Sequence, residues 1–191
     1  MTKEVINNEA EYFRSNKIVG TFKKILSINN FQFEGKNFMD LSKSINMLKT
    51  ERQLLLRGIE NLSGEQLLII PMGSKNNILW NLGHIIVTQQ VLHYTLSRLE
   101  MRISKELASA FRTGSSPEIW KETPDLTEIK SLFLELPDKL LEDYNNGMFK
   151  EFRPYKTSTG VELSTFGDAI TFNHFHEGTH TGIILGLIKR L

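Results

Sequence analysis

Two histidines near the C-terminus have the spacing of metal ligands. His176 and His180 are four residues apart, and on a helix this spacing directs both imidazoles to one side, about one turn apart. The positions that share this face step by three or four residues: Phe166, Ala169, Asn173, His176, His180, Ile184, Leu187 and Leu191. The pattern predicts a helix that presents both histidines together, close enough to share one divalent ion.

His84 is the third candidate ligand. It lies in ILWNLGHIIVTQQ, an apolar segment in which a neutral imidazole is costly unless a partner takes its lone pair. The other two histidines point elsewhere. Helical geometry places His93 on the face opposite His84, and His174 faces away from the C-terminal pair. We therefore expect His93 and His174 to be structural or exposed.

The run from His176 to His180 reads HEGTH and also matches the H-E-x-x-H signature of zinc peptidases, in which Glu177 would be the general base. Common enzymes of that kind take a third ligand downstream. The residues after His180 include no His, Asp or Glu, and glycine inside the motif weakens the helix. We interpret the match as a coincidence.

Three further residues are candidates to support the site. Asn173 is one turn before His176 on the same face, where it can hold a ligand or contact a substrate. Glu177 is about 100° around the helix from His176, so it can either support the ligand or face solvent. Trp80 is one turn before His84 and can either wall a cavity or pack in the core. No residue is assigned a catalytic role.

Periodicity and turn residues predict four main helices, over residues 41–62, 77–99, about 125–145 and 163–191. A short helix is expected at residues 104–111, followed by a long crossover. Residues 149–162 have the composition of an extended connection or a short hairpin. The fold class predicted is therefore all-α, a four-helix bundle with one or more crossovers.

Composition limits the possible partners. The chain has 191 residues, 40% of them hydrophobic, with 23 basic and 22 acidic side chains and no cysteine. The balanced charge argues against nucleic-acid binding, and no apolar run is long enough for a membrane span or a signal peptide. Without thiolates, any metal must bind to nitrogen and oxygen. We expect a cytoplasmic protein that acts on a small-molecule substrate.

The chain divides into two parts. Residues 1–38 form an N-terminal extension, in which residues 5–28 are a candidate extra helix, and residues 39–191 form the bundle domain. Met39 is a candidate alternative start.

These motifs resemble the DinB/YfiT-like family of metal-dependent enzymes. The family carries W-x-x-x-H on the second bundle helix, matched from Trp80 to His84. It also carries H-x-x-x-H followed by a small and an aliphatic residue on the last helix, matched from His176 to Ile183. The resemblance covers about residues 39–191. It implies an up-down-down-up bundle, three histidine ligands at His84, His176 and His180, and a homodimer.

The resemblance also bears on chemistry. It implies a divalent ion, nickel or zinc first, with manganese or iron as alternatives. Some relatives look like transferases or isomerases that use thiols such as bacillithiol or mycothiol, while many have no established activity. Three nitrogen ligands leave open positions on the ion, where water or a thiol loses its proton more easily. We expect hydrolysis or thiol transfer; the alternative is a non-catalytic metal-binding or stress-response bundle.

Overall fold

The computed structural model describes residues 41–191. The N-terminal extension, the helix predicted at residues 5–28 and the candidate start at Met39 lie outside the described residues. Within the described part, the fold is all-α, and its core is a bundle of four long helices: α3 (Leu41–Gly58), α5 (Ile78–Gln90), α7 (Leu126–Asn145) and α8 (Phe166–Ile188).

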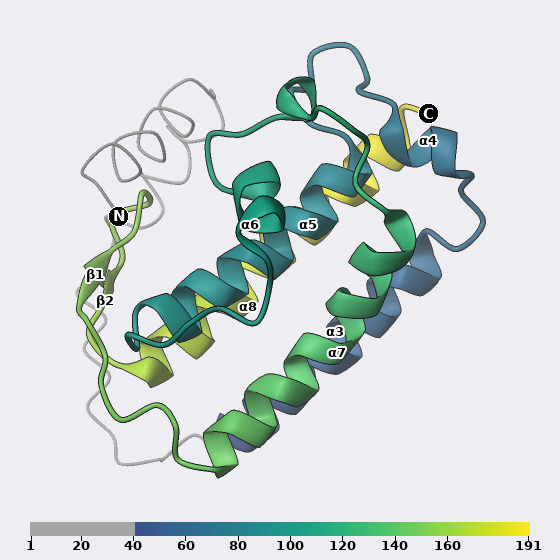
Figure 1. Cartoon of the computed structure of the whole chain (residues 1–191). Helices are drawn as coiled ribbons and strands as arrows, with labels where there is room; N and C mark the ends of the chain where they lie inside the picture. The colour runs from purple at the N-terminus through teal and green to yellow at the C-terminus, as the bar shows by residue number, and fades with distance from the viewer. Residues whose placement is uncertain (1–40) are drawn as a thin grey trace, which may run out of the picture.

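The bundle has the up-down-down-up arrangement. Helices α3 and α8 run in one direction and α5 and α7 in the other, as Figure 1 shows. Because α5 and α7 run the same way, the chain between them must cross the length of the bundle. Helix α3 packs on α7 and α8, and α5 also packs on α7 and α8. The helices that carry the three candidate ligands, α5 and α8, are therefore direct neighbours.

Local sequence signals set the helix ends. The side chain of Asn77 accepts a hydrogen bond at the start of α5, and Asp125 does the same at the start of α7. Thr165 and Asp168 form a capping box at the start of α8. Helix α3 ends at Gly58, earlier than predicted, where the amides of Ile59 and Glu60 donate only three residues back. A separate short helix, α4 (Gly64–Leu68), then begins with its own capping box at Ser63.

The helix predicted to continue to residue 99 does not do so as an α-helix. It widens after Gln90 into a π-helix, η1 (Val91–Thr95). The amide of Leu96 donates to the carbonyl of Val91, five residues back. At the end of this turn the amides of Arg98 and Leu99 donate to the carbonyls of Thr95 and Tyr94, which is the bonding of a Schellman cap. Arg98 then adopts a positive φ of 59°, which ends the helical path. Apolar periodicity could not reveal this change, because a π-turn adds a single residue to an otherwise helical pattern.

The connections carry smaller elements. The crossover between α5 and α7 contains α6 (Lys105–Phe111) and a 3-10 turn, η2 (Pro117–Ile119). The connection between α7 and α8 contains a two-stranded antiparallel hairpin, β1 (Tyr155–Lys156) with β2 (Glu162–Leu163). The short helix predicted at residues 104–111 and the hairpin are confirmed.

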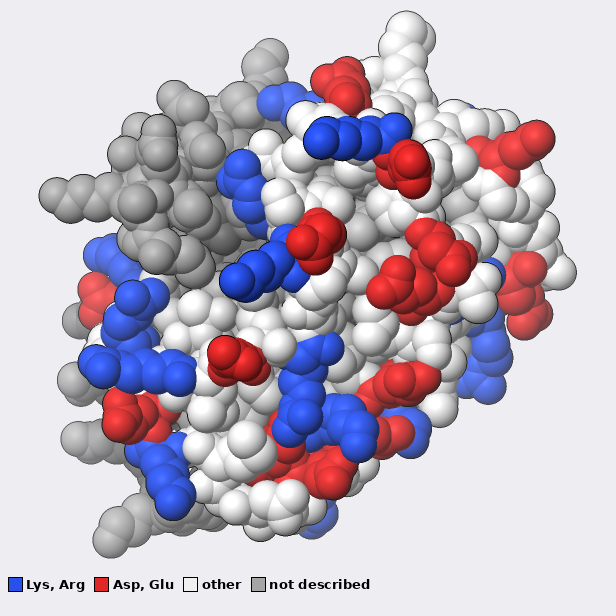
Figure 2. Space-filling model, in the orientation of Figure 1, with Lys and Arg blue, Asp and Glu red and all other residues white. Residues whose placement is uncertain are grey.

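Helix α5 is the centre of the fold. All but one of its residues are buried, because α6, α7 and α8 cover it from different sides. On the face of the molecule in Figure 2, basic and acidic side chains are interspersed, and neither sign dominates. In residues 41–191, no helix combines the length and the apolar character that crossing a bilayer requires.

Candidate metal centre

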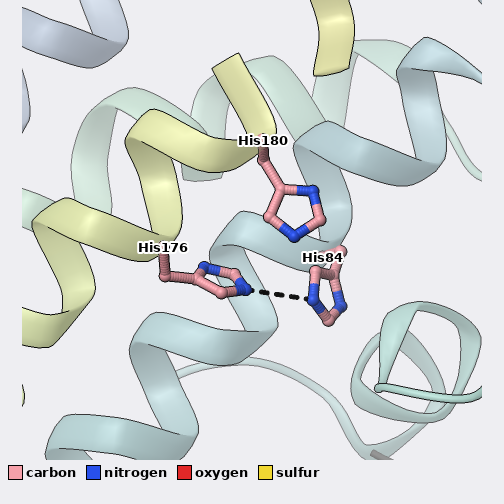
Figure 3. A group of neighbouring side chains, drawn as sticks. All are labelled: His84, His176 and His180. Atoms are coloured by element: carbon pink, nitrogen blue, oxygen red, sulfur yellow. Dashed lines mark hydrogen bonds between the residues drawn. The ribbon is translucent and has the colours of Figure 1, made fainter. Parts of the chain in front are cut away.

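Three imidazoles meet at the seam between α5 and α8. His84 comes from α5, and His176 and His180 come from adjacent turns of α8 (Figure 3). One ring nitrogen from each lies within 4.8 Å of the other two. The structure thus brings together the three histidines that the sequence singled out, although 92 residues separate His84 from His176.

The spacing fits a divalent ion. The Nε2 atoms of His84 and His176 are 3.2 Å apart. Two nitrogen ligands at about 2.0–2.1 Å from one ion lie roughly 3.0–3.4 Å apart, which is the same separation. The three-histidine donor set also suits zinc, nickel and similar ions. The residues present therefore fit a metal ion.

A backbone contact fixes the proton on His84. Its Nδ1 lies 2.8 Å from the carbonyl oxygen of Phe111, at the end of α6. A carbonyl only accepts hydrogen bonds, so Nδ1 carries the proton and donates. Nε2 is then left with its lone pair and points toward His176. The hydroxyl of Thr88, 3.4 Å from Nε2, is a weak second neighbour.

An amide fixes the proton on His180. Its Nδ1 lies 2.8 Å from Oδ1 of Asn81, and the Nδ2 of Asn81 donates to the carbonyl of Asn77 at 2.7 Å. Because the amide nitrogen of Asn81 is engaged by that carbonyl, its oxygen is the atom that faces His180. His180 must therefore donate this hydrogen bond from Nδ1. Its Nε2 then carries no proton, and its lone pair is available to bind a metal.

His176 is held differently. Its Nδ1 is buried and has no hydrogen-bond partner in the described structure. Since Nε2 of His84 is an acceptor, Nε2 of His176 is the donor in the contact between them. Of the three rings, His176 thus has the weakest support from the surrounding protein.

Burial keeps all three rings neutral. Desolvation lowers the pKa of His84 to about 4. Desolvation first, and the neighbouring imidazoles second, lower the pKa of His176 and of His180 well below the ordinary value. A metal ligand must be the neutral imidazole, so at neutral pH these rings need not lose a net proton before binding an ion. His176 must only move its proton from Nε2 to Nδ1.

Trp80 covers one side of the centre. Its ring stacks on His84 with a centroid distance of 4.6 Å and an interplanar angle of 10°. Its indole nitrogen donates to the hydroxyl of Ser115 in the crossover at 3.0 Å. Trp80 is almost fully buried, so it packs in the core and also walls the site.

Asn173 and Glu177 lie in another cluster. The amide of Asn173 donates to Glu177 at 2.7 Å, and Arg52 of α3 donates to both carboxylate oxygens of Glu177. Glu177 is thus buried in the bundle interior rather than exposed. No contact of either residue with the three ligand rings is seen in the described residues.

His93 and His174 are placed as expected from helical geometry. His93 is fully buried and packs against the ring of Phe166. His174 contacts the carboxylate of Glu51 and the carbonyl of Ser44. Neither belongs to the group of three rings.

Sequence reasoning missed Arg52 and Asn81. A signal existed for each. Arg52 is four residues after Leu48 and three before Leu55, both buried, so it falls on the apolar face of α3. Asn81 is a polar residue inside the apolar run that contains His84. A polar side chain at a core position requires a partner, which marks both residues for attention.

A surface pocket of about 760 Å³ lies beside α6. Its lining includes Leu107, Phe111, Ile119 and Trp120, together with lysines and glutamates of the crossover. Phe111 is common to the pocket and to the metal centre, because its carbonyl holds His84. The crossover therefore connects a concave surface to one of the ligands.

A family model described as the DinB superfamily matches residues 47–184, a segment that includes all three histidines. No curated protein matches the chain.

Proposed function

We propose, since this chain belongs to the DinB superfamily, that His84, His176 and His180 form a catalytic metal centre. The bound ion is a divalent cation, with nickel or zinc as the first candidates. The reaction is hydrolysis or transfer of a thiol group, with water or a low-molecular-weight thiol as the nucleophile. The observation that carries the proposal is the convergence of three neutral imidazole nitrogens within 4.8 Å.

The chain's own residues prepare the centre. Phe111 and Asn81 hold the protons of His84 and His180 on Nδ1, so both Nε2 atoms are ready to bind. A divalent ion bound there would keep positions open and would lower the pKa of a water or thiol that occupies one. Because the chain has no cysteine, a thiol nucleophile would have to be a small molecule.

The structure argues against the peptidase interpretation of HEGTH. In that mechanism Glu177 would take a proton from water beside the metal. Here Arg52 engages both oxygens of the Glu177 carboxylate, at 3.0 and 2.7 Å, and Glu177 is buried. A carboxylate held in the bundle interior is not available as a base at the seam of α5 and α8.

A small-molecule substrate is the class that we propose. The pocket beside α6 has a volume of about 760 Å³, which is in the range of small-molecule sites. None of the three histidines lines this pocket, so its volume supports a small-molecule ligand beside α6 and does not by itself place that ligand at the metal.

The experiment is a titration of the cobalt-substituted protein with a low-molecular-weight thiol. We expect the visible absorption of cobalt to change and a sulfur-to-cobalt charge-transfer band to appear at stoichiometric thiol. The His176→Ala variant, measured at the same cobalt concentration, is the control for thiol binding to free cobalt. A cobalt spectrum that does not respond to thiol, or to any change of solvent ligand, would contradict the catalytic proposal.

One observation favours the second candidate, a non-catalytic metal-binding bundle. His84 and His180 are each only 5% exposed, and a buried site is typical of a structural metal. The same titration separates the two, because a structural site has no exchangeable position for the thiol.

We also propose that the protein is a homodimer and that it is cytoplasmic. Sedimentation equilibrium tests the oligomeric state, and fractionation of the producing cells tests the location.

A further inference from the structure

A single guanidinium connects the four helices of the bundle. Arg52 of α3 is 1% exposed. Its Nε and Nη2 donate to the two oxygens of Glu177 on α8, Nη2 also donates to Oε1 of Gln89 on α5 at 3.1 Å, and Nη1 donates to the carbonyl of Phe133 on α7 at 3.1 Å. The guanidinium also lies over the ring of Phe133, 4.8 Å from its centroid.

Two residues that Arg52 contacts lie close in the sequence to metal ligands. Glu177 immediately follows His176, and Gln89 is five residues after His84 on the same helix. Arg52 therefore holds α5 and α8 from the inside of the bundle, while the histidines meet at the seam between the same two helices. Rotation or sliding of either helix would break a hydrogen bond to Arg52 and would also separate the ligand nitrogens.

Stability alone does not explain this arrangement. Burying two charges carries a large desolvation cost, and apolar side chains of similar volume often give an equally stable or more stable protein. The ion pair instead fixes the relative orientation of the groups that it joins, because the planar guanidinium has five donors in a fixed geometry. Asn173 adds a further bond to Glu177 at 2.7 Å, which limits the positions that the carboxylate can take.

We propose that Arg52 is a positioning residue for the metal centre: through Glu177 and Gln89 it sets the relative placement of α5 and α8, and so the separation of His84 from His176 and His180. This inference rests on the proposed metal site. It differs from the proposed function because it concerns the geometry of the three rings, which is measurable with or without an ion.

The test removes both charges at once. The double variant Arg52→Met with Glu177→Gln leaves no unpaired buried charge. The matched control is Arg102→Met with Asp143→Asn. It removes an ion pair of 2.5 Å between Arg102 in the crossover and the buried carboxylate of Asp143 on α7. For each protein, the thermal midpoint, the dissociation constant for Co²⁺ and the visible spectrum of the cobalt form are measured.

We expect the Arg52 double variant to keep its helical content and to bind Co²⁺ at least about tenfold more weakly, with an altered spectrum. The control should bind within about threefold of the wild type, whatever its midpoint. Equal cobalt affinity and an unchanged spectrum in the Arg52 variant would overturn the proposal. If that variant does not fold, Arg52→Lys replaces it, because lysine keeps the charge but lacks the planar set of donors.

A wild type that binds no cobalt would refute the proposed function, and the positioning role is then decided on the metal-free protein. The ¹⁵N signals of the histidine rings report which nitrogen carries the proton. We expect the signals of His84, His176 and His180 to shift in the Arg52 variant and to stay in place in the control. Unchanged signals in the Arg52 variant would contradict the inference independently of any metal.

Discussion

The side chain of Asn81 on α5 accepts a hydrogen bond from Nδ1 of His180 on α8, at 2.8 Å. This bond crosses the same seam that the histidines occupy, and it directs the free nitrogen of His180 toward the other two rings. A residue three positions before one ligand thus orients another ligand 99 residues away in sequence.

Replacing Asn81 should weaken metal binding without removing a ligand. In Asn81→Ala, His180 loses the acceptor that fixes its proton on Nδ1, and we expect the affinity for Zn²⁺ to fall about 10–100-fold. Asn81→Asp keeps an acceptor oxygen and should retain most of the affinity. Calorimetric titration with Zn²⁺ measures both variants. If alanine and aspartate at this position gave the same affinity, the orienting role of Asn81 would be wrong.

The metal-free protein should lose stability as the pH falls below 6.5. Burial, and secondly the charge of Arg52, lower the pKa of His93 to about 3. Above pH 6.5 this histidine is neutral in both states and contributes no pH dependence. Between pH 6.5 and 3, the unfolded chain binds a proton that the folded chain excludes, so the free energy of unfolding falls by up to about 1.4 kcal/mol per pH unit.

Urea denaturation of metal-free wild type and His93→Gln at several pH values tests this prediction. The glutamine variant removes the titrating group, so its stability should fall less steeply between pH 6.5 and 4. Because other histidines are also buried, the stability of both proteins will still depend on pH. The test therefore compares the slopes of the free energy of unfolding against pH in the two proteins. Parallel slopes would mean that His93 is protonated in the folded protein as readily as in the unfolded chain.

Gly83 should not tolerate a side chain. A Cβ at this position would lie 2.3 Å from the ring of Phe111, whose carbonyl holds His84. In Gly83→Ala the ring must move, and we expect a loss of about 1–3 kcal/mol in the free energy of unfolding together with weaker metal binding. Gly186→Ala on α8 is the matched control, because a Cβ there has no neighbour within 4 Å.

The free energy of unfolding of the control variant Gly186→Ala should rise by up to about 1 kcal/mol, because alanine has a higher helix propensity than glycine. Urea denaturation gives both values, and calorimetry gives the metal affinity. An equally stable Gly83→Ala protein would show that the contact of Phe111 with α5 is not close in solution.

The helices and the histidine cluster were predictable because both follow from local patterns. Apolar periodicity located α3, α5, α7 and α8, and turn residues indicated the breaks between them. His176 and His180 are a local pair on one face of one helix. His84 was identified by its apolar surroundings, which is again a local property.

The parts that were not predictable depend on contacts between distant residues. Glu177 could be read as exposed or as a support for His176, because its partner Arg52 lies 125 residues away in the sequence. The carbonyl of Phe111 that holds His84 has no signature in the sequence at all. The π-turn after Gln90 is a change of one residue in the helical hydrogen-bonding pattern, which periodicity cannot detect.

The most direct test of the metal centre is elemental analysis of tag-free protein after reconstitution with nickel, zinc or manganese. Wild type is compared with His84→Ala, His176→Ala and His180→Ala, and His174→Ala serves as the control that removes a histidine outside the group. We expect about one ion per chain in the wild type and in the control, and little or none in the three ligand variants. A wild type that retains no ion, or ligand variants that retain as much as the wild type, would contradict the account.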